Sequence, residues 1–335
     1  MQPRVHYLKN AIATPTVLDH VSKTFTGVVY DSNGDICIDA QRSRAEANEW
    51  QPSDLQRITP SKSKDYIPGK SLYLGHYTGH YGHFLLETLS RLWVLKGQTL
   101  AGAGYDRVVF HPFVHKCPSV ARFSAAQIVF SAFGIPPNKA LILSDYQTFE
   151  HLTVPQPLFE INFTVAPPLS GVYRRIARHA LSLPTHKVGF LRSLTGWAGD
   201  GDLKIYVSRR RARGYHPMRN ERAVENVFRD LGFKILHPER WRFEQQVALF
   251  QRADVLAGVE GSALHNSVFM RPGTRVISIG TPREPSGDIL NQRLCDSLSG
   301  VSSTSIPFVG QVVGGLKARY DVEFLRSQLK TLLLS

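Results

Sequence analysis

Residues 204–211 read KIYVSRRR and residues 254–266 read DVLAGVEGSALHN, and these two stretches decide the fold of the second half of the chain. Each begins with a short apolar run that is typical of a buried strand. The first run ends in three arginines, and the second ends in a Gly-Ser turn from which we expect a helix to begin at Ser262. Arginines and the amide groups of a helix N-terminus both suit a negatively charged ligand. The pair of stretches therefore predicts a pyrophosphate site.

Strand and helix patterns alternate around these two stretches. We expect strands at 204–208, 234–236, 254–257 and 275–279, with helices at 220–231 and 242–252. Strands separated by helices of this length form right-handed βαβ units and a parallel sheet. Ligands of such sheets bind at the carboxyl ends of the strands, where residues 208–209 and 258–262 are expected to lie.

The N-terminal half alternates in the same way. Strands are expected at 72–74, 108–110 and 140–143, and helices at 82–96 and 121–133, whereas residues 41–68 are polar and are expected at the surface. A group of prolines between 155 and 168 marks a domain boundary. The sequence therefore predicts an α/β fold with an N-terminal domain at 1–165, a C-terminal domain at 166–318 and a last amphipathic helix at 319–335. The pattern also allows that helix to pack back on the N-terminal domain.

Composition points to a soluble, basic protein. The 335 residues suit two domains of ordinary size. Lys and Arg outnumber Asp and Glu by 40 to 27, a net charge of +13, which favours anionic partners. The three cysteines form no pair at metal-site spacing, so we expect a reducing, cytoplasmic setting. Residues 1–19 lack the apolar core of a signal peptide, and no apolar stretch reaches the ~20 residues of a membrane span.

A second dense segment, GHYTGHYGHFLLETLSRLW, occupies residues 75–93. On a helix, His83, Glu87 and Arg91 would share one face at spacings of four residues. A carboxylate beside a histidine can act as a general base. Two other interpretations stay open: an ordinary Glu–Arg pair beside a packing histidine, or a metal site made by His80, His83 and Glu87.

The pyrophosphate interpretation also has an alternative. Guanidinium groups of Arg209 and Arg210 match phosphate oxygens, and Gly261 allows the backbone to approach a ligand closely. The stretch from Arg209 to Arg213 could instead be a solvated surface run, with Gly261 only turning the chain. The position of both features at adjacent strand ends favours the ligand.

Together these segments resemble glycosyltransferase family 61 over about residues 72–280. The family's first motif, aromatic-Gly-His-aromatic-Leu-Leu-Glu-x-Leu-x-Arg, matches residues 81–91. Its second, a Tyr-Val-Ser-Arg-Arg strand followed by Asn-Glu, matches residues 206–210 and 220–221, and Gln246 matches a glutamine of the next helix. Its third, a Gly-x-His-Gly-Ala/Ser-x-Leu-x-Asn turn, matches residues 258–266, except that Glu260 replaces the usual histidine. His80 likewise replaces an asparagine.

The resemblance implies a GT-B-like architecture, with two Rossmann-like domains facing across a cleft, and inversion at the anomeric carbon. It implies Glu87 as the general base, with His83 orienting it, and His80 and Arg91 on the acceptor side. The donor side would be formed by Arg209, Arg210, Asn220, Glu221, Glu260, Gly261, Ser262, Ala263 and Asn266. The arginines and the helix N-terminus would neutralise the departing diphosphate, so no metal and no cofactor are expected.

The expected partners are a nucleotide-sugar donor and a glycan or lipid-linked glycan acceptor, as in the synthesis of capsule or lipopolysaccharide. The expected location is cytoplasmic, with peripheral contact to the inner membrane surface as an option. Two other functions remain open. The chain could be a nucleotide-sugar-binding subunit without catalysis, or a nucleic-acid-binding protein, although it carries no known nucleic-acid motif.

Overall fold

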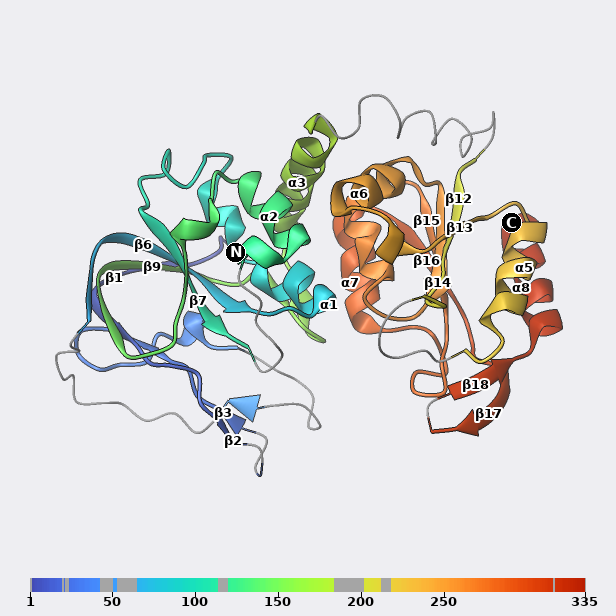
Figure 1. Ribbon diagram of the computed structural model, residues 1–335, viewed down its shortest axis with the longest axis horizontal. Coiled ribbons are helices and arrows are strands. Elements are labelled where there is room, and N and C mark those ends of the chain that lie inside the picture. Colours follow the sequence, from blue (N-terminus) through green and yellow to red (C-terminus); the bar gives the residue numbers. More distant parts are fainter. Residues whose placement is uncertain are drawn as a thin grey trace. The chain divides into compact units, whose positions relative to one another are not determined.

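The computed structural model describes residues 2–19, 21, 24–42, 51–52, 65–113, 120–183, 202–211, 218–315 and 317–334. The chain divides into two compact units, Met1–Ile176 and Ala177–Ser335 (Figure 1). The division falls within the helix α3 (Ser170–Ser182). The sequence places this boundary earlier, at residue 165.

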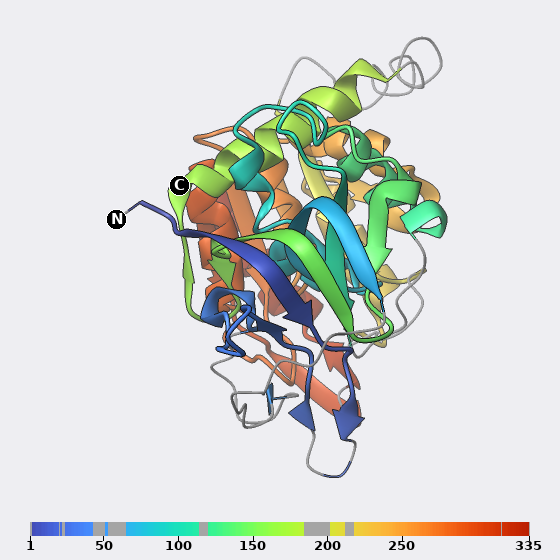
Figure 2. The ribbon, with the colours of Figure 1, turned by 90° about the vertical axis from the view of Figure 1, so that its left-hand side faces the viewer.

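The first unit is built on a mixed six-stranded sheet in the order β4-β1-β9-β6-β7-β8. Its members are β1 (Val5–Ala13), β4 (Val29–Tyr30), β6 (Tyr66–Tyr77), β7 (Arg107–Pro112), β8 (Ala140–Ile142) and β9 (Gln147–Pro155). Strands β9, β6, β7 and β8 run parallel, whereas β1 is antiparallel to both β4 and β9. Figure 2 shows β1, β9 and β6 side by side as long, bent strands. The α/β prediction is confirmed, but β1 and β4 make this sheet mixed rather than wholly parallel.

Short elements complete the first unit. Two small sheets join β2 (Leu18–Asp19), β3 (Thr24–Phe25) and β5 (Gln51–Pro52), and β10 (Phe159–Glu160) with β11 (Thr164–Val165). Helix α2 spans Ser124–Ser131, and 3-10 helices lie at η1 (Ile38–Ala40), η4 (Val120–Arg122), η5 (Pro137–Lys139) and η6 (Pro167–Leu169).

The prediction of a single helix at 82–96 is wrong. The segment forms α1 (Tyr81–His83), the π-helix η2 (Phe84–Thr88) and the 3-10 helix η3 (Leu92–Leu95). The Thr88 hydroxyl donates to the His76 carbonyl at 2.7 Å, and the Ser90 hydroxyl donates to the Glu87 carbonyl at 2.7 Å. The Ser90 bond is local and competes with the regular helical pattern, whereas the Thr88 bond ties the segment to β6, and π-bulges are common at functional sites.

The second unit contains a five-stranded, wholly parallel sheet in the order β13-β12-β14-β15-β16. Its strands are β12 (Lys204–Val207), β13 (Lys234–Leu236), β14 (Val255–Val259), β15 (Arg275–Ile279) and β16 (Ser302–Ile306). Four of them confirm the predicted strands, and β16 is an additional, polar strand. The chain adds β13 on one side of β12 and then β14 on the other. The order therefore reverses between β12 and β14, as in doubly wound sheets.

Helices cover both faces of this sheet. α5 (Glu221–Asp230) and α8 (Val322–Leu334) lie on one face, and α6 (Phe243–Arg252) and α7 (Leu290–Ser299) lie on the other (Figure 1). On the first face, Phe228 of α5 and Leu329 of α8 share an apolar core with strand residues such as Tyr206 and Ile277. The last helix thus buries its apolar side against α5, within the second unit.

The prediction of a helix that begins at Ser262 is also wrong. Residues 261–263 form a turn, followed by a six-residue 3-10 helix, η9 (Leu264–Phe269). The remaining elements are the 3-10 helix η8 (Pro238–Arg240) and a hairpin of β17 (Gly310–Gly314) and β18 (Lys317–Tyr320). In the described ranges, no helix is both long and apolar enough to cross a membrane.

We predict that Asp296, a buried residue of α7, makes stability depend on pH. Burial raises the pKa of this carboxyl from 3.8 to about 6, although Gln292 donates to it at 2.8 Å. Its stabilising effect is present below pH 3.8 and is lost as pH rises through about 6. The free energy of unfolding of Asp296→Asn, relative to that of the wild type, should therefore increase by up to about 3 kcal/mol from pH 4 to pH 8.

Urea unfolding at both pH values measures this difference. Asp288→Asn is the control, because Asp288 is an exposed partner of Arg293. An Asp296→Asn gain that is the same at pH 4 and pH 8 would contradict the prediction.

Candidate functional site

The first candidate site lies where β6 and β7 end. After Tyr77, the last residue of β6, the chain turns, and His80 precedes α1 as its N-cap. Its Nδ1 accepts a bond from the His83 amide at 3.4 Å, and the two imidazole rings lie 4.8 Å apart. The carboxyl ends of parallel strands are where ligands of such sheets bind.

Glu87 is the centre of this site. Its Oε2 is 2.5 Å from His83 Nδ1 and 2.7 Å from Arg42 Nη2, and its Oε1 accepts from Arg42 Nε. The Arg42 guanidinium therefore binds the carboxylate in a bidentate manner, the strongest geometry for such a pair. Both side chains are largely buried, with 4% of Arg42 and 14% of Glu87 exposed. We call this group the Arg42–His83–Glu87 cluster.

The cluster fixes the ionisation of Glu87 and the tautomer of His83. Burial raises the pKa of the Glu87 carboxyl, but the charge of Arg42 and the bonds from His83 and Arg42 outweigh it. The pKa of Glu87 therefore lies well below its usual range, and the group is a carboxylate. Since a carboxylate only accepts, His83 Nδ1 carries the proton. In the neutral ring, Nε2 then holds the lone pair.

Phe113 and a small cavity complete the surroundings of the cluster. The Arg42 guanidinium lies 3.9 Å from the centre of the Phe113 ring, which directly follows β7. A cavity of about 20 Å³, lined by Arg42, Glu87, His76 and residues that follow β9, lies beside the carboxylate. Within the described ranges, the buried Arg42 Nη1 and His76 Nε2 have no hydrogen-bond partner. A cavity of this size and polarity suits one small polar group.

Arg91, predicted on the acceptor side, is a buried residue that bonds to backbone carbonyls of its own unit. It is 4% exposed, and it donates to the carbonyls of Pro155 at 3.0 Å and Asp39 at 2.5 Å. A side chain at Gly75 would collide with its guanidinium, since a Cβ there would lie 2.3 Å from Nη1. The arginine that pairs with Glu87 is thus Arg42, which lies in the stretch that the sequence pattern predicts to be polar surface. Nothing in the spacing of residues 41–87 indicates this pair.

The second candidate site lies in the second unit, where the strand order reverses. Val207 of β12 is the register partner of Gly258 of β14, so Ser208 and Glu260 follow neighbouring strand ends. The Ser208 hydroxyl lies 2.7 Å from Glu225 Oε1 and 3.2 Å from Glu221 Oε1. Glu221 also accepts the Arg209 amide at 2.6 Å. These buried carboxylates fix the backbone that carries the arginines.

Glu225 is a buried residue that the sequence analysis does not single out. It is fully buried and accepts from Arg210 Nε at 3.0 Å and from Arg229 Nη2 at 2.9 Å. Burial raises the pKa of Glu225, but the bonds from Ser208, Arg210 and Arg229 lower it further, below its usual value. Its position four residues after Glu221, on the same helix face, is the only sequence signal. Arg210 is therefore held by a protein carboxylate.

Arg209 lies beside the turn after β14. A Cβ built on Gly261 would lie 3.3 Å from Arg209 Nη1, and Gly261 has φ of +126°. This close approach and the positive φ both favour glycine. The neighbouring Glu260 accepts a bond from the Thr281 hydroxyl at 2.9 Å. Burial raises the pKa of Glu260, with Glu284 adding to this effect, whereas Thr281, Arg209 and Arg283 oppose it.

The other predicted donor residues have structural contacts. The Asn220 amide group bonds to both backbone groups of Tyr320 at 2.9 Å, which ties the start of α5 to β18. Asn266 donates to the Ala263 carbonyl at 2.9 Å, and Gln246 donates to the carbonyls of Pro238 and Trp241 at 3.0 Å. Ser262 and Ala263 lie in the turn before η9.

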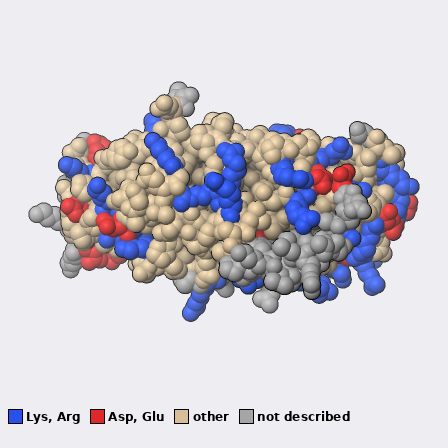
Figure 3. All heavy atoms as spheres, turned by 90° about the horizontal axis from the view of Figure 1, so that it is seen from above, with Lys and Arg blue, Asp and Glu red and all other residues tan. Residues whose placement is uncertain are grey.

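The charged side chains of the described residues include many cations and form no metal-binding group. Figure 3 shows Lys and Arg side chains spread over one face, with Asp and Glu in smaller groups. In the described part of the chain, no three His, Cys, Asp or Glu side chains are arranged to hold a metal ion. His80, His83 and Glu87 are neighbours in sequence, but they form no such group.

Two comparisons with known proteins bear on these sites. A family model described as Glycosyltransferase 61 matches residues 81–277, more than half of the chain. The matched range includes His83 and Glu87 as well as the strand ends at Ser208 and Glu260. No curated protein matches the sequence.

We predict that Arg42 is essential for the stability of the first site. Arg42→Met leaves Glu87 as a buried carboxylate without its cationic partner, which should cost about 3–5 kcal/mol at pH 7. The folded pKa of Glu87 lies well below its ordinary value of 4.5, so the contribution of the pair is fully present above pH 4.5 and is lost progressively as the pH falls from 4.5 towards the folded pKa. The difference in the free energy of unfolding between Arg42→Met and the wild type should therefore narrow as the pH falls below 4.5.

Urea unfolding at pH 7 and pH 4 measures both effects. The matched control is Arg4→Met, which breaks the pair with Asp39, because Arg4 is 55% exposed. Its effect should be clearly smaller, and equal losses in the two variants would show that burial of the Arg42 pair has no special importance.

Proposed function

The chain belongs to the glycosyltransferase 61 family, and on this basis we propose that it transfers a sugar from a nucleotide-sugar donor to a hydroxyl group of a glycan, with inversion. The Arg42–His83–Glu87 cluster is the observation that carries the catalytic part of the proposal. The proposal includes a GT-B-type organisation, with the base in the first unit and the donor site in the second.

In this proposal His83 is the general base and Glu87 orients it. The sequence predicts the opposite roles. A carboxylate that is bound in a bidentate manner by buried Arg42 has a low pKa, and a base of low pKa removes a hydroxyl proton inefficiently near pH 7. His83 instead donates Nδ1–H to Glu87, and in the neutral ring this leaves Nε2 to accept a proton. A carboxylate that holds an imidazole in one tautomer is the arrangement of many hydrolase triads.

The reaction is then a single displacement. The acceptor hydroxyl gives its proton to His83 Nε2 while its oxygen forms a bond to the anomeric carbon of the donor. The bond from that carbon to the diphosphate breaks, and the electron pair leaves with the diphosphate oxygen. Glu87 stabilises the imidazolium that forms, and the proton later returns to solvent.

The donor diphosphate is proposed to bind at the strand-order reversal of the second unit. Arg209, placed there beside Gly261, supplies a planar cation for phosphate oxygens. Such reversals are the usual ligand sites of doubly wound sheets. The η9 segment is too short to supply a helix dipole, so the charge of the leaving group is assigned to arginine rather than to a helix N-terminus. Neutralisation by side chains makes a metal ion unnecessary in this mechanism.

The acceptor is proposed to be a cell-surface glycan under synthesis, such as capsule or lipopolysaccharide, carried on a lipid at the cytoplasmic membrane face. The net charge of +13 supports an acidic or membrane-associated partner.

We predict that His83→Ala lowers turnover by about 10²-fold or more and leaves donor affinity unchanged. Added imidazole should restore part of the activity of this variant, because the small base can occupy the vacated position. Glu87→Gln should also lose activity, because the wrong tautomer of His83 becomes available. The measurement is sugar transfer with a donor selected from a nucleotide-sugar panel by thermal stabilisation.

His151→Ala, at an exposed position of the same unit, is the control for effects of imidazole itself. Rescue of Glu87→Ala by formate, together with near-normal turnover of His83→Ala, would return the role of base to Glu87.

We predict that Arg209→Ala weakens binding of nucleoside diphosphates by about 10-fold or more, since a bond between charged groups contributes about 1.5–3 kcal/mol. Isothermal calorimetry with UDP, GDP and CDP measures this. Arg271→Ala is the matched control, because Arg271 precedes β15 and pairs with Asp254 before β14, at the opposite ends of the strands. Equal affinities in the two variants would place the diphosphate elsewhere.

A further inference from the structure

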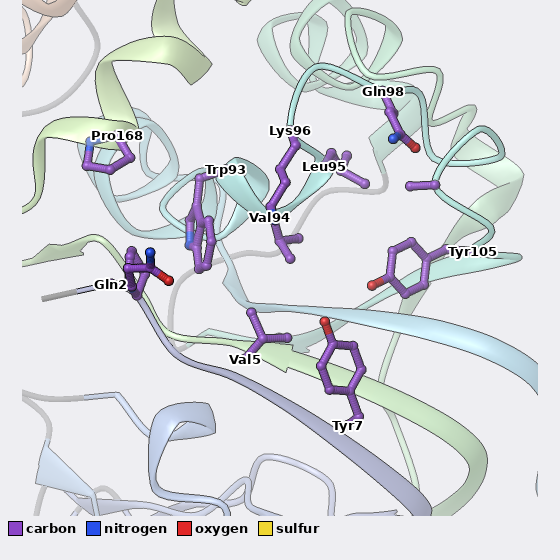
Figure 4. Close-up of a pocket in the computed structure, with 12 residues that line it drawn as sticks. Gln2, Val5, Tyr7, Trp93, Val94, Leu95, Lys96, Gln98, Tyr105 and Pro168 are labelled. Carbon is purple, nitrogen blue, oxygen red and sulfur yellow. The ribbon is translucent and has the colours of Figure 1, made fainter.

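The first unit contains a pocket of about 560 Å³ that none of the proposed catalytic groups lines. It is formed by the start of β1, by η3 and by the loop that follows η3 (Figure 4). It shares no lining residue with the cavity beside Glu87. Its volume falls in the range of pockets that bind small molecules.

Three aromatic side chains line the pocket: Tyr7, Trp93 and Tyr105. Tyr7 is 76% exposed, a large value for an aromatic residue within a sheet. The Trp93 ring is held in place, because its Nε1–H donates to the Gln156 carbonyl at 2.9 Å. In Figure 4, Tyr7 and Tyr105 lie at one end of the pocket, and Trp93 lies towards Gln2 and Pro168 at the other. A ligand therefore meets aromatic surface at both ends.

Polar groups stand between and around the rings. Gln2, Lys96 and Gln98 line the pocket and are exposed. Their side chains form no hydrogen bond with any other residue that the structure describes. Each amide offers both donors and an acceptor, and Lys96 offers three donors. No acidic side chain is among the twelve lining residues.

This combination matches the chemistry of a sugar chain. A pyranose ring has an apolar face of C–H groups that packs on an aromatic ring, and an edge of hydroxyls that both donate and accept hydrogen bonds. Tyr and Trp combine an apolar body with a polar tip and suit such ligands. An acyl chain would leave the amides and Lys96 without partners, which is unfavourable for binding.

We propose that this pocket binds a carbohydrate chain, with sugar rings against Trp93 and Tyr7 and hydroxyls bonded to Gln2, Gln98 and Lys96. Because it lies in the unit that carries His83, its ligand is the glycan acceptor, at sugars away from the reacting hydroxyl. This identification of the ligand as acceptor rests on the proposed function. The absence of lining carboxylates and the presence of Lys96 make neutral and acidic glycans both acceptable.

The test is direct binding to the full chain without any donor. The probes are maltohexaose, chitohexaose and hyaluronan hexasaccharide at up to 10 mM, with saturation-transfer NMR and tryptophan fluorescence as readouts. We expect at least one probe to bind the wild type and its affinity to fall about tenfold in Trp93→Ala and in Tyr7→Ala. Tyr7 is so exposed that its replacement keeps the fold, even where loss of the Trp93 bond does not.

Tyr66→Ala is the matched control, because Tyr66 is a 51% exposed tyrosine of the same unit that does not line the pocket. Its affinity should equal that of the wild type. Failure of all three probes to bind, or equal affinity in Tyr7→Ala and Tyr66→Ala, overturns the proposal. If binding is lost in Tyr7→Ala while no donor supports transfer by the wild type, the pocket stands and the transferase proposal fails. If the wild type transfers sugar but binds none of the oligosaccharides, the transferase proposal stands and the pocket proposal fails.

Discussion

The ion pair between Arg42 and Glu87 is the interaction on which the first unit's candidate site depends. A buried carboxylate is costly unless it is paired and hydrogen-bonded, and here one guanidinium satisfies both oxygens. The pair keeps Glu87 ionised, and an ionised Glu87 requires the proton of His83 to be on Nδ1. In the same segment, the Thr88 hydroxyl ties η2 to the His76 carbonyl of β6, and the Ser90 hydroxyl bonds to the Glu87 carbonyl before η3.

The second unit uses buried carboxylates in the same way, but for a different purpose. Glu221 and Glu225 bind the hydroxyl and amide groups around Ser208, and Glu225 also holds Arg210. The result is a difference between two adjacent arginines. Arg210 is committed to a fully buried carboxylate, whereas Arg209 lies against the glycine of the neighbouring strand end. A diphosphate at Arg210 would have to compete with Glu225, whereas at Arg209 it would meet the turn after β14.

Sequence patterns predicted what depends on periodicity. The strands of the second unit, the helices beginning near residues 221 and 243, and the juxtaposition of Arg209 with Gly261 are all present in the structure. Patterns failed where a tertiary contact overrides them. Apolar spacing alone cannot show that Thr88 and Ser90 interrupt a helix, or that residues 261–263 turn before a 3-10 segment. The partner of Glu87 was missed because Arg42 is distant in sequence and lies in a polar stretch.

Glu260 shows how the site tolerates a carboxyl group next to a proposed diphosphate site. Two such negative groups close together would repel each other, and Glu284 adds a third. The opposing contributions come from the Thr281 hydroxyl, Arg209 and Arg283, so the carboxyl is stabilised from the protein side. Burial nevertheless raises the pKa of Glu260, so an approaching anion would add to the unfavourable electrostatics of this carboxylate. A ligand with hydroxyl groups at this position would instead donate hydrogen bonds to the Glu260 carboxylate and so reduce the repulsion. The hydroxyls of a ribose or a sugar have that chemistry.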